Sequence, residues 1–112
     1  QVQPFAVFVG STTAGIEFAP RAAARLGIPI ASDCVDLGME NGQLVVVRPV
    51  LGGRVQTAVK VCGDGPVIVT VRQGSFERVA AAGGNAPVEP FAFTLEAADT
   101  RLEVREAPAE GK

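Results

Sequence analysis

The sequence predicts an α/β fold, in the form of a partial domain with parallel strands, one main helix and an antiparallel meander. Phe5–Val9 is a short, continuous apolar run, which is typical of a strand buried on both faces in a parallel sheet. A helical pattern follows over residues 15–26. Residues 34–72 then alternate between apolar runs and glycine-containing turns, which indicates antiparallel strands.

The loop Gly10–Gly15 separates the first strand from the helix. Ser11, Thr12 and Thr13 are each able to cap the first helical turn with a side-chain oxygen. Pro20 is compatible with two starting points for the helix. Either the helix begins near Thr13 and Pro20 lies beyond its first turn, or the main helix begins with Pro20 as its first residue.

The far end and the buried face of this helix follow from the same pattern. Gly27 is placed to end the helix in a left-handed conformation. Four apolar residues share one face at helical spacing, and we expect that face to be buried. They are Ile16, Ala19, Ala23 and Leu26.

Ile28–Leu37 is predicted to be a second strand. Asn41-Gly42 is the strongest turn signal and favours a two-residue hairpin with arms over residues 34–39 and 43–50. After a second turn at Gly52-Gly53, Arg54–Val61 alternates as a half-exposed antiparallel strand. Pro66–Arg72 is then expected to return as a buried strand.

The character of the chain changes after Phe76. Residues 80–90 are rich in Gly and Pro and indicate a connection, and last strands are expected around Phe91–Leu95 and Leu102–Arg105. We therefore expect one part over residues 1–79 and a second over 80–112.

One helix and one parallel-type strand do not complete a parallel sheet. The chain is thus expected to belong to a larger α/β domain or to take strands from a partner; the alternative is a compact β-rich domain with one covering helix.

Composition excludes several functions. The 112 residues contain no His, Trp or Tyr and carry a net charge of −2, so neither His-based catalysis nor a basic surface for nucleic acid is expected. No catalytic group, and hence no autonomous enzyme, is predicted. No apolar segment is long enough for membrane insertion, and no targeting segment is visible. Cys34 and Cys62 allow one disulfide, but reduced packing cysteines in buried strands or at strand ends are the favoured interpretation.

A phosphate or nucleotide could bind at Gly10, Ser11, Thr12 and Thr13, because a loop between a strand and a helix presents backbone N–H groups to an anion. The loop lacks the lysine of the P-loop pattern, so a plain capping role is favoured. A free-standing phosphate-binding module and a ligand-free oligomerisation domain both remain alternatives.

The charged residues indicate no metal site. Asp33 and Asp36 face opposite sides of a regular strand, and with Glu40 they are expected to be solvated at turns and edges. Four arginines are expected to be scattered over the surface; the alternative is that the folded sheet collects some of them into an anion-binding patch. The four are Arg48, Arg54, Arg72 and Arg78.

The run Val7–Leu37, VFVGSTTAGIEFAPRAAARLGIPIASDCVDL, resembles the alpha subunit of electron-transfer flavoproteins. It contains counterparts of the family's Gly-Ser-Thr loop, its helix LAPRxAARL and its strand with ADC. Arg48-Pro49 with Gly52-Gly53 resembles the family's RPxxGG. Thr70–Phe76 resembles ATVRPGxF and departs from it at Gln73, where the family usually has proline.

The resemblance implies a Rossmann-like domain, similar to adenine nucleotide alpha hydrolases, of which this chain would be the later part. Residues 80–112 would lead toward an FAD domain beyond Lys112, so no FAD would bind within residues 1–112. The implied partners are the beta subunit and, through the intact complex, flavin dehydrogenases. The implied location is the bacterial cytoplasm or the mitochondrial matrix. By the same resemblance, the related domain of the beta subunit holds AMP at the loop that corresponds to Gly10–Thr13, whereas the corresponding site of an alpha subunit is expected to be empty.

Overall fold

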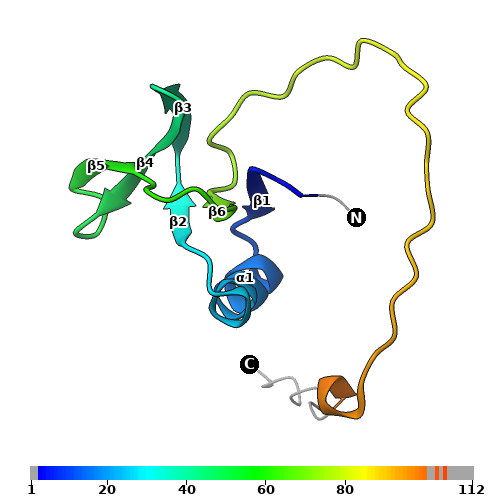
Figure 1. The fold of residues 1–112 in the computed structure, drawn as a ribbon. Coiled ribbons are helices and arrows are strands. Elements are labelled where there is room, and N and C mark those ends of the chain that lie inside the picture. The colour runs from blue at the N-terminus through cyan, green and yellow to red at the C-terminus, as the bar shows by residue number, and fades with distance from the viewer. Residues whose placement is uncertain (1–2, 101–102, 104, 106–112) are drawn as a thin grey trace, which may run out of the picture. The chain divides into compact units, whose positions relative to one another are not determined.

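The computed structural model describes residues 3–100, 103 and 105, and the chain divides into two units, Gln1–Ala80 and Ala81–Lys112. The first unit follows the order of elements that the sequence predicts and confirms the α/β class (Figure 1). Its elements are β1 (Ala6–Gly10), α1 (Thr13–Leu26), β2 (Ile30–Cys34), β3 (Asp36–Glu40), β4 (Gln43–Val50), β5 (Val55–Lys60) and β6 (Val67–Val71).

A parallel sheet is formed by β1, β6 and β2, in that order. The centre belongs to β6, which pairs with β1 from Ala6↔Val67 to Gly10↔Val71 and with β2 on its other side. Val67–Thr70 are all buried, as expected for an apolar run flanked by strands on both sides. The predicted buried strand over Pro66–Arg72 is thereby confirmed.

The prediction that Phe5–Val9 is buried on both faces is wrong. Within the described residues β1 pairs with β6 alone and is therefore an edge strand. Phe5 lies just before it, and the side chains of Phe5 and Phe8 are 57% and 55% exposed. A continuous apolar run indicates a strand of the parallel type, but it does not reveal how many neighbours that strand has.

The helix begins near the loop, so the first of the two starts is correct. Thr12 is the N-cap, and its Oγ1 accepts a hydrogen bond from the N–H of Gly15 at 3.1 Å. Pro20 lies inside α1 on its exposed side and has no N–H to donate to the carbonyl one turn earlier. Gly27 ends the helix with φ 65°, as predicted.

The buried face of α1 differs from the predicted one. Gly15, Ala19 and Ala23 are buried, whereas Ile16 and Leu26 are 61% and 68% exposed. Small residues face the sheet because the helix lies close to it: a Cβ built on Gly15 would lie 2.0 Å from the carbonyl oxygen of Gly10. The large apolar residues are displaced to the flank of the helix.

The antiparallel meander is confirmed as the sheet β3-β4-β5. Asn41 and Gly42 have φ of 50° and 76°, the left-handed pair that a type I′ hairpin requires. The first arm starts at Asp36 and not at residue 34, because the chain leaves the parallel sheet after Cys34. The N–H of Val35 then donates to the carbonyl of Val47 at 2.8 Å, which connects β2 to β4.

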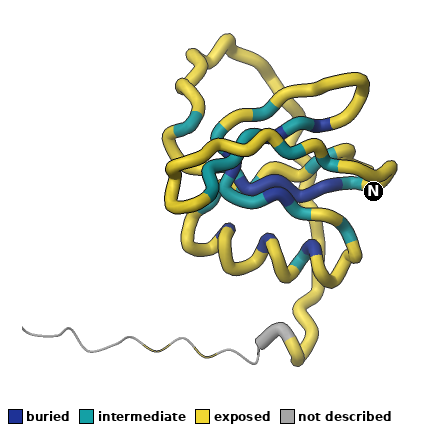
Figure 2. The backbone as a smooth tube through the Cα atoms, turned by 90° about the vertical axis from the view of Figure 1, so that its left-hand side faces the viewer, coloured by how far each residue is buried: buried dark blue, intermediate teal, exposed yellow. Residues whose placement is uncertain are grey.

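Two buried clusters lie on opposite faces of β6, which with Val67–Thr70 contributes a continuous buried stretch, while the helix is buried only along one side (Figure 2). On one face Ile68 packs with Ala19 and Ala23 of α1. On the other face the side chains come from β2, β4 and β6. They are Ala31, Cys34, Leu44, Val46, Val67 and Val69.

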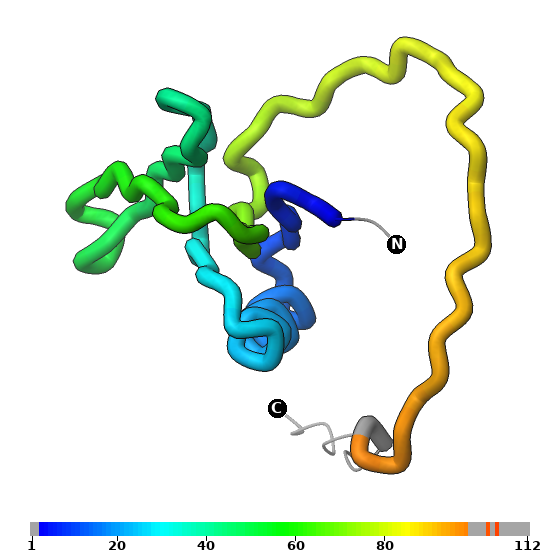
Figure 3. The backbone as a smooth tube through the Cα atoms, viewed as in Figure 1, coloured from blue at the N-terminus to red at the C-terminus, as the bar shows by residue number. Residues whose placement is uncertain are grey.

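The described residues of the second unit have little regular structure, as their trace shows (Figure 3). The strand predicted for Phe91–Leu95 is absent, and the only regular element in its described part is the 3-10 helix Ala97–Thr100. Of the other predicted strand, Leu102–Arg105, residues 102 and 104 lie outside the described residues.

Candidate functional site

A hollow of about 530 Å³ lies at the carboxyl end of the parallel sheet, beside α1. Residues at the carboxyl ends of all three strands line it. Ligand sites of parallel sheets commonly lie at this end of the strands. Its lining is mostly polar side chains, with two apolar residues from the helix. The lining residues are Ser11, Ile16, Pro20, Ser32, Asp33, Thr70, Arg72 and Gln73.

A β-bulge places Asp33 at this hollow. Ala31 pairs with Val69 and Cys34 with Val71, so Ser32 and Asp33 together oppose Thr70. Asp33 has φ 59°, a left-handed conformation that Asp tolerates better than most residues. The Oγ1 of Thr70, itself buried, accepts the N–H of Asp33 at 2.8 Å and satisfies the backbone group that the bulge displaced.

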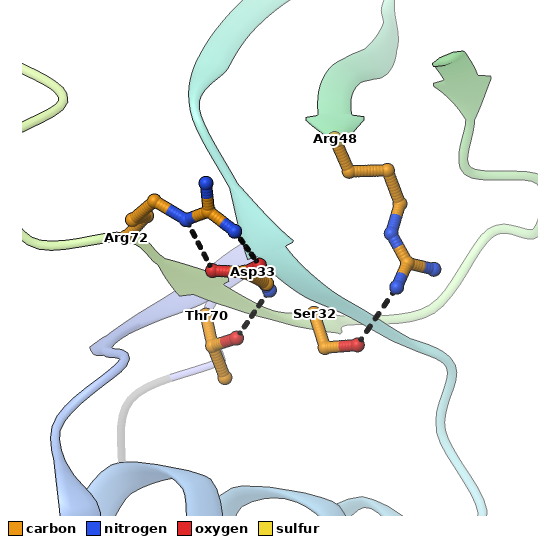
Figure 4. A network of polar contacts seen from close by, with 5 residues as sticks. All are labelled: Ser32, Asp33, Arg48, Thr70 and Arg72. Carbon is orange, nitrogen blue, oxygen red and sulfur yellow. Dashed lines mark hydrogen bonds and ion pairs between the residues drawn. The ribbon is translucent and has the colours of Figure 1, made fainter. Parts of the chain in front are cut away.

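The bulge joins Asp33 to Arg72 in a bidentate ion pair (Figure 4). The Nε of Arg72 donates to Oδ1 of Asp33 at 2.9 Å, and Nη2 donates to Oδ2. The N–H of Arg72 also donates to the carbonyl of Cys34 at 2.9 Å. Backbone and side chain of Arg72 therefore both fasten the end of β2 to the end of β6.

Arg48 approaches the same strand end from β4. Its Nη2 donates to the Oγ of Ser32 at 3.3 Å, as Figure 4 shows. Its Nε is buried and has no hydrogen-bond partner among the described residues. Arg48 and Arg72 thus flank Asp33, while Arg54 and Arg78 are exposed elsewhere; the prediction that the arginines are scattered is wrong for Arg48 and Arg72.

The loop predicted as a phosphate site borders the hollow through Ser11. The N–H of Ser11 is already used by the carbonyl of Val71 at 2.8 Å, and the hydroxyl of Thr12 caps the helix. Thr13 begins the helix with an exposed side chain, and Gly10 ends β1. The buried Oγ of Ser11 has no partner among the described residues, which makes it the free polar group of this loop.

The remaining acidic residues lie apart from Asp33. Asp36 accepts the N–H of Leu37 at 2.9 Å, and Glu40 pairs with Lys60 at 3.5 Å across the meander. Among the described residues no group of three or more Asp, Glu or Cys is placed to hold a metal ion. In the same part of the chain, no helix has the length and apolarity needed to cross a bilayer.

The Asp33–Arg72 pair gives the first testable prediction. The hydrogen bonds from Arg72 lower the pKa of Asp33. Burial opposes them to a lesser extent, and the charges of Arg72 and Arg48 lower the pKa further. The pKa of Asp33 is thus lower in the folded protein than in the unfolded one. Its carboxylate therefore contributes to the free energy of unfolding above the unfolded pKa, and this contribution is lost as the pH falls through the folded pKa. Asp33→Asn, which keeps the left-handed backbone accessible, should therefore lower stability slightly at pH 7 and hardly at all at pH 2.

Urea denaturation of both proteins at the two pH values measures this difference. The effect is expected to be small because the side chains of the pair are 41% and 49% exposed and solvent screens their interaction. An equal loss at both pH values would show that the carboxylate charge contributes nothing.

The two cysteines are free and differ in exposure. Cys34 is completely buried, and burial raises the pKa of its thiol, whereas Cys62 is exposed. The prediction of reduced cysteines agrees with this structure, but the predicted burial is wrong for Cys62. The exposed position follows the end of β5, where the chain turns toward β6.

Thiol labelling should separate the two cysteines. A thiolate-directed reagent should modify Cys62 rapidly in the folded protein and Cys34 only after denaturation. Burial of Cys34 blocks the reagent and disfavours the thiolate. Cys62→Ser should abolish the fast phase and Cys34→Ala should leave it unchanged. A fast phase that survives Cys62→Ser would contradict the burial of Cys34.

Sequence reasoning missed the Asp33–Arg72 pair and the role of Thr70. The pair joins positions 39 residues apart, and strict strand alternation misplaces Asp33 because of the bulge. The available signal was local: Ser32-Asp33 interrupts an apolar strand, and Arg72 follows another at the same end of a parallel sheet.

Comparison with known proteins gives consistent results. Residues 1–96 match the family model "Electron transfer flavoprotein domain". The chain is 38% identical over 106 residues to protein FixB of Clostridium saccharobutylicum, covering 93% of this chain and 32% of the relative. It is 36% identical over 108 residues to the electron transfer flavoprotein subunit alpha of Clostridium acetobutylicum, covering 91% and 32%.

A third relative carries a different name. The chain is 38% identical over 77 residues to the lactate dehydrogenase (NAD(+),ferredoxin) subunit LctC of Acetobacterium woodii, covering 68% of this chain and 18% of that subunit. The chain therefore spans about a third of the length of the first two relatives and less of the third.

Proposed function

The chain belongs to the electron transfer flavoprotein family, and from this premise we propose that it forms the scaffold and beta-subunit docking part of an alpha subunit. The intact protein would be an FAD-containing carrier that takes electrons from flavin dehydrogenases to an acceptor. The observation that carries the proposal is the family match over residues 1–96, together with two relatives, protein FixB and an alpha subunit, that align over nine-tenths of this chain.

The first unit is suited to a scaffold. Its central strand is buried, and its helix lies in close contact with the sheet. The free edge at β1 and the exposed rings of Phe5 and Phe8 offer an apolar surface on which further protein could pack. We propose that residues 1–79 act as this scaffold and that residues 80–112 lead toward an FAD domain.

The hollow beside Asp33 does not fit FAD. The diphosphate of FAD needs cationic or N–H donors, and the only cationic side chain that lines the hollow, Arg72, is already balanced by Asp33. The N–H of Ser11 is likewise already used. We therefore propose that the flavin binds to residues outside this chain and that its redox chemistry takes place there.

Reconstitution with flavin tests the proposal. The 112-residue chain mixed with FAD and desalted should show no visible flavin absorbance. A carboxyl-extended alpha subunit co-expressed with its beta subunit should purify as a yellow complex. Stoichiometric FAD on the 112-residue chain, or a beta subunit that does not associate, would overturn it.

A second candidate function is supported by Ser11. Its buried, unpartnered Oγ lies in the lining of a hollow that also holds the hydroxyls of Ser32 and Thr70. A single phosphate group, on inorganic phosphate or a nucleoside monophosphate, needs fewer donors than the diphosphate of FAD. Bound beside Gly10–Thr13, it would supply the acceptor that this hydroxyl lacks. Calorimetry with AMP, ADP and ATP tests this. Heat that is lost in Ser11→Ala would support a phosphate-binding module, and no heat at millimolar ligand would reject it.

A further inference from the structure

The tip of the hairpin between β3 and β4 consists of Asn41 and Gly42, and both residues are exposed. The ladder ends at the pair Glu40↔Gln43, so these two residues alone form the loop. Within the described residues no hydrogen bond involves the side chain of Asn41 or the N–H of Gly42. The side-chain amide of Asn41 and the backbone nitrogen of Gly42 are therefore both available for a reaction with each other.

An asparagine that is followed by glycine is able to lose ammonia without an enzyme. The backbone nitrogen of Gly42 attacks Cγ of Asn41, so that an N–Cγ bond forms and the Cγ–Nδ2 bond breaks. The amide proton of Gly42 leaves with the side-chain nitrogen as ammonia, and a five-membered succinimide ring remains. Water then opens the ring, either at Cγ to give aspartate or at the backbone carbonyl to give isoaspartate. Glycine favours the attack because no side chain lies beside its nitrogen.

The observed turn does not hold the two reacting atoms in line. Asn41 and Gly42 have φ of 50° and 76°, a type I′ turn, in which ψ of the first residue is about +30°. Closure of the succinimide ring eclipses the Cα–Cβ bond of Asn41 with the backbone C–N bond to Gly42. For an L residue this requires ψ of about −120°, the value at the first position of a type II′ turn.

We propose that Asn41 is a site of spontaneous deamidation in the folded protein, reached by a flip of the Asn41–Gly42 peptide that converts the type I′ turn to type II′. The flip leaves φ of Asn41 almost unchanged and moves φ of Gly42 to about −80°, which glycine adopts freely. Both turn types join two strands through the same two-residue loop. The pair Glu40↔Gln43 and the rest of the hairpin therefore remain intact during the reaction.

The populations of the two reactive states favour the flip over unfolding. The first position of a type II′ turn is strained for asparagine, and strain of the usual size leaves the flipped turn in roughly one molecule in 5 to one in 150. A protein of ordinary stability is unfolded in at most about one molecule in 5,000. The flipped turn thus supplies most of the reactive conformation, although the reaction stays slower than in a flexible chain.

The two products affect the hairpin differently. Aspartate at position 41 adds a negative charge beside Glu40, which pairs with Lys60 at 3.5 Å. It keeps the hairpin, because aspartate also tolerates the left-handed conformation. Isoaspartate inserts one more atom into the backbone, so the two-residue loop no longer fits the register Glu40↔Gln43. We expect only the isoaspartate product to loosen the pairing of β3 with β4.

Incubation of the 112-residue chain near neutral pH, followed by peptide mass spectrometry that separates aspartate from isoaspartate, tests the proposal. The folded chain should form both products at position 41, about 5-fold to 150-fold more slowly than the chain unfolded in urea. Asn41→Gln should abolish the modification, because its longer side chain would have to close a larger ring. An Asn41 that stays intact in the folded chain while it reacts in the unfolded one would reject the modification site.

Urea below the unfolding transition distinguishes the peptide flip from unfolding. The flip exposes no additional surface, so the rate at Asn41 should not change with urea in this range. A reaction through the unfolded chain would accelerate roughly 5-fold or more for each added molar of urea, and that result would reject the flip. Asn85 is the internal control for direct effects of urea on the chemistry, because it lies in the connection without regular structure.

Discussion

Replacing Gly15 by alanine should lower the free energy of unfolding by at least about 3 kcal/mol, the upper part of the range for overpacked sites. The new Cβ would lie 2.0 Å from the carbonyl oxygen of Gly10 and 3.1 Å from the Cγ1 of Val9. The closer contact is with a backbone atom at the end of a hydrogen-bonded strand, so a change of rotamer does not relieve it. The helix must move away from the sheet and separate Ala19 and Ala23 from Ile68.

Gly10→Ala is the matched control for this substitution. It ends the strand that precedes the helix, has no positive φ, and its Cβ would meet only the Cγ2 of Thr12 at an ordinary 3.7 Å. Its stability should change by less than about 1 kcal/mol, with a small gain possible from reduced freedom of the unfolded chain. Urea denaturation measures both variants. A Gly15→Ala protein as stable as Gly10→Ala would contradict the close contact between helix and sheet.

Local signals in the sequence predicted most of the elements of the first unit. The Asn41-Gly42 turn and the glycine after the helix each act through neighbouring residues, so their outcome does not depend on the rest of the fold. The edge position of β1 and the exposure of Ile16 and Leu26 depend on which strands and helices pack nearby. Periodicity along one segment contains no information about those neighbours.

The candidate site depended more strongly on tertiary structure. One extra residue in β2 turns Asp33 toward Arg72, and the backbone of this bulge is held by Thr70 of the adjacent strand. Neither partner is near Asp33 in the sequence. The prediction of a strand at Phe91–Leu95 was wrong for a related reason. The alternating side-chain pattern is present, but a strand also needs the edge of a neighbouring strand with which to pair.

Val69→Ala should lower the free energy of unfolding by roughly 2–3 kcal/mol, because it removes two methyl groups and leaves a cavity. Val69 is fully buried in the central strand and packs with side chains from β2 and β4. It thus belongs to the layer that connects the parallel sheet to the antiparallel one. The loss should leave the cooperativity of unfolding unchanged, since both sheets share this core.

Val79→Ala is the control for Val69→Ala, because the Val79 side chain is 87% exposed and its truncation leaves no cavity. Its stability should stay within about 0.5 kcal/mol of the original protein. Urea denaturation followed by circular dichroism compares the two variants at equal concentration. If Val69→Ala instead produced two separate transitions, the parallel and antiparallel sheets would be independent folding units. An unchanged midpoint would mean that β6 is not the centre of the core.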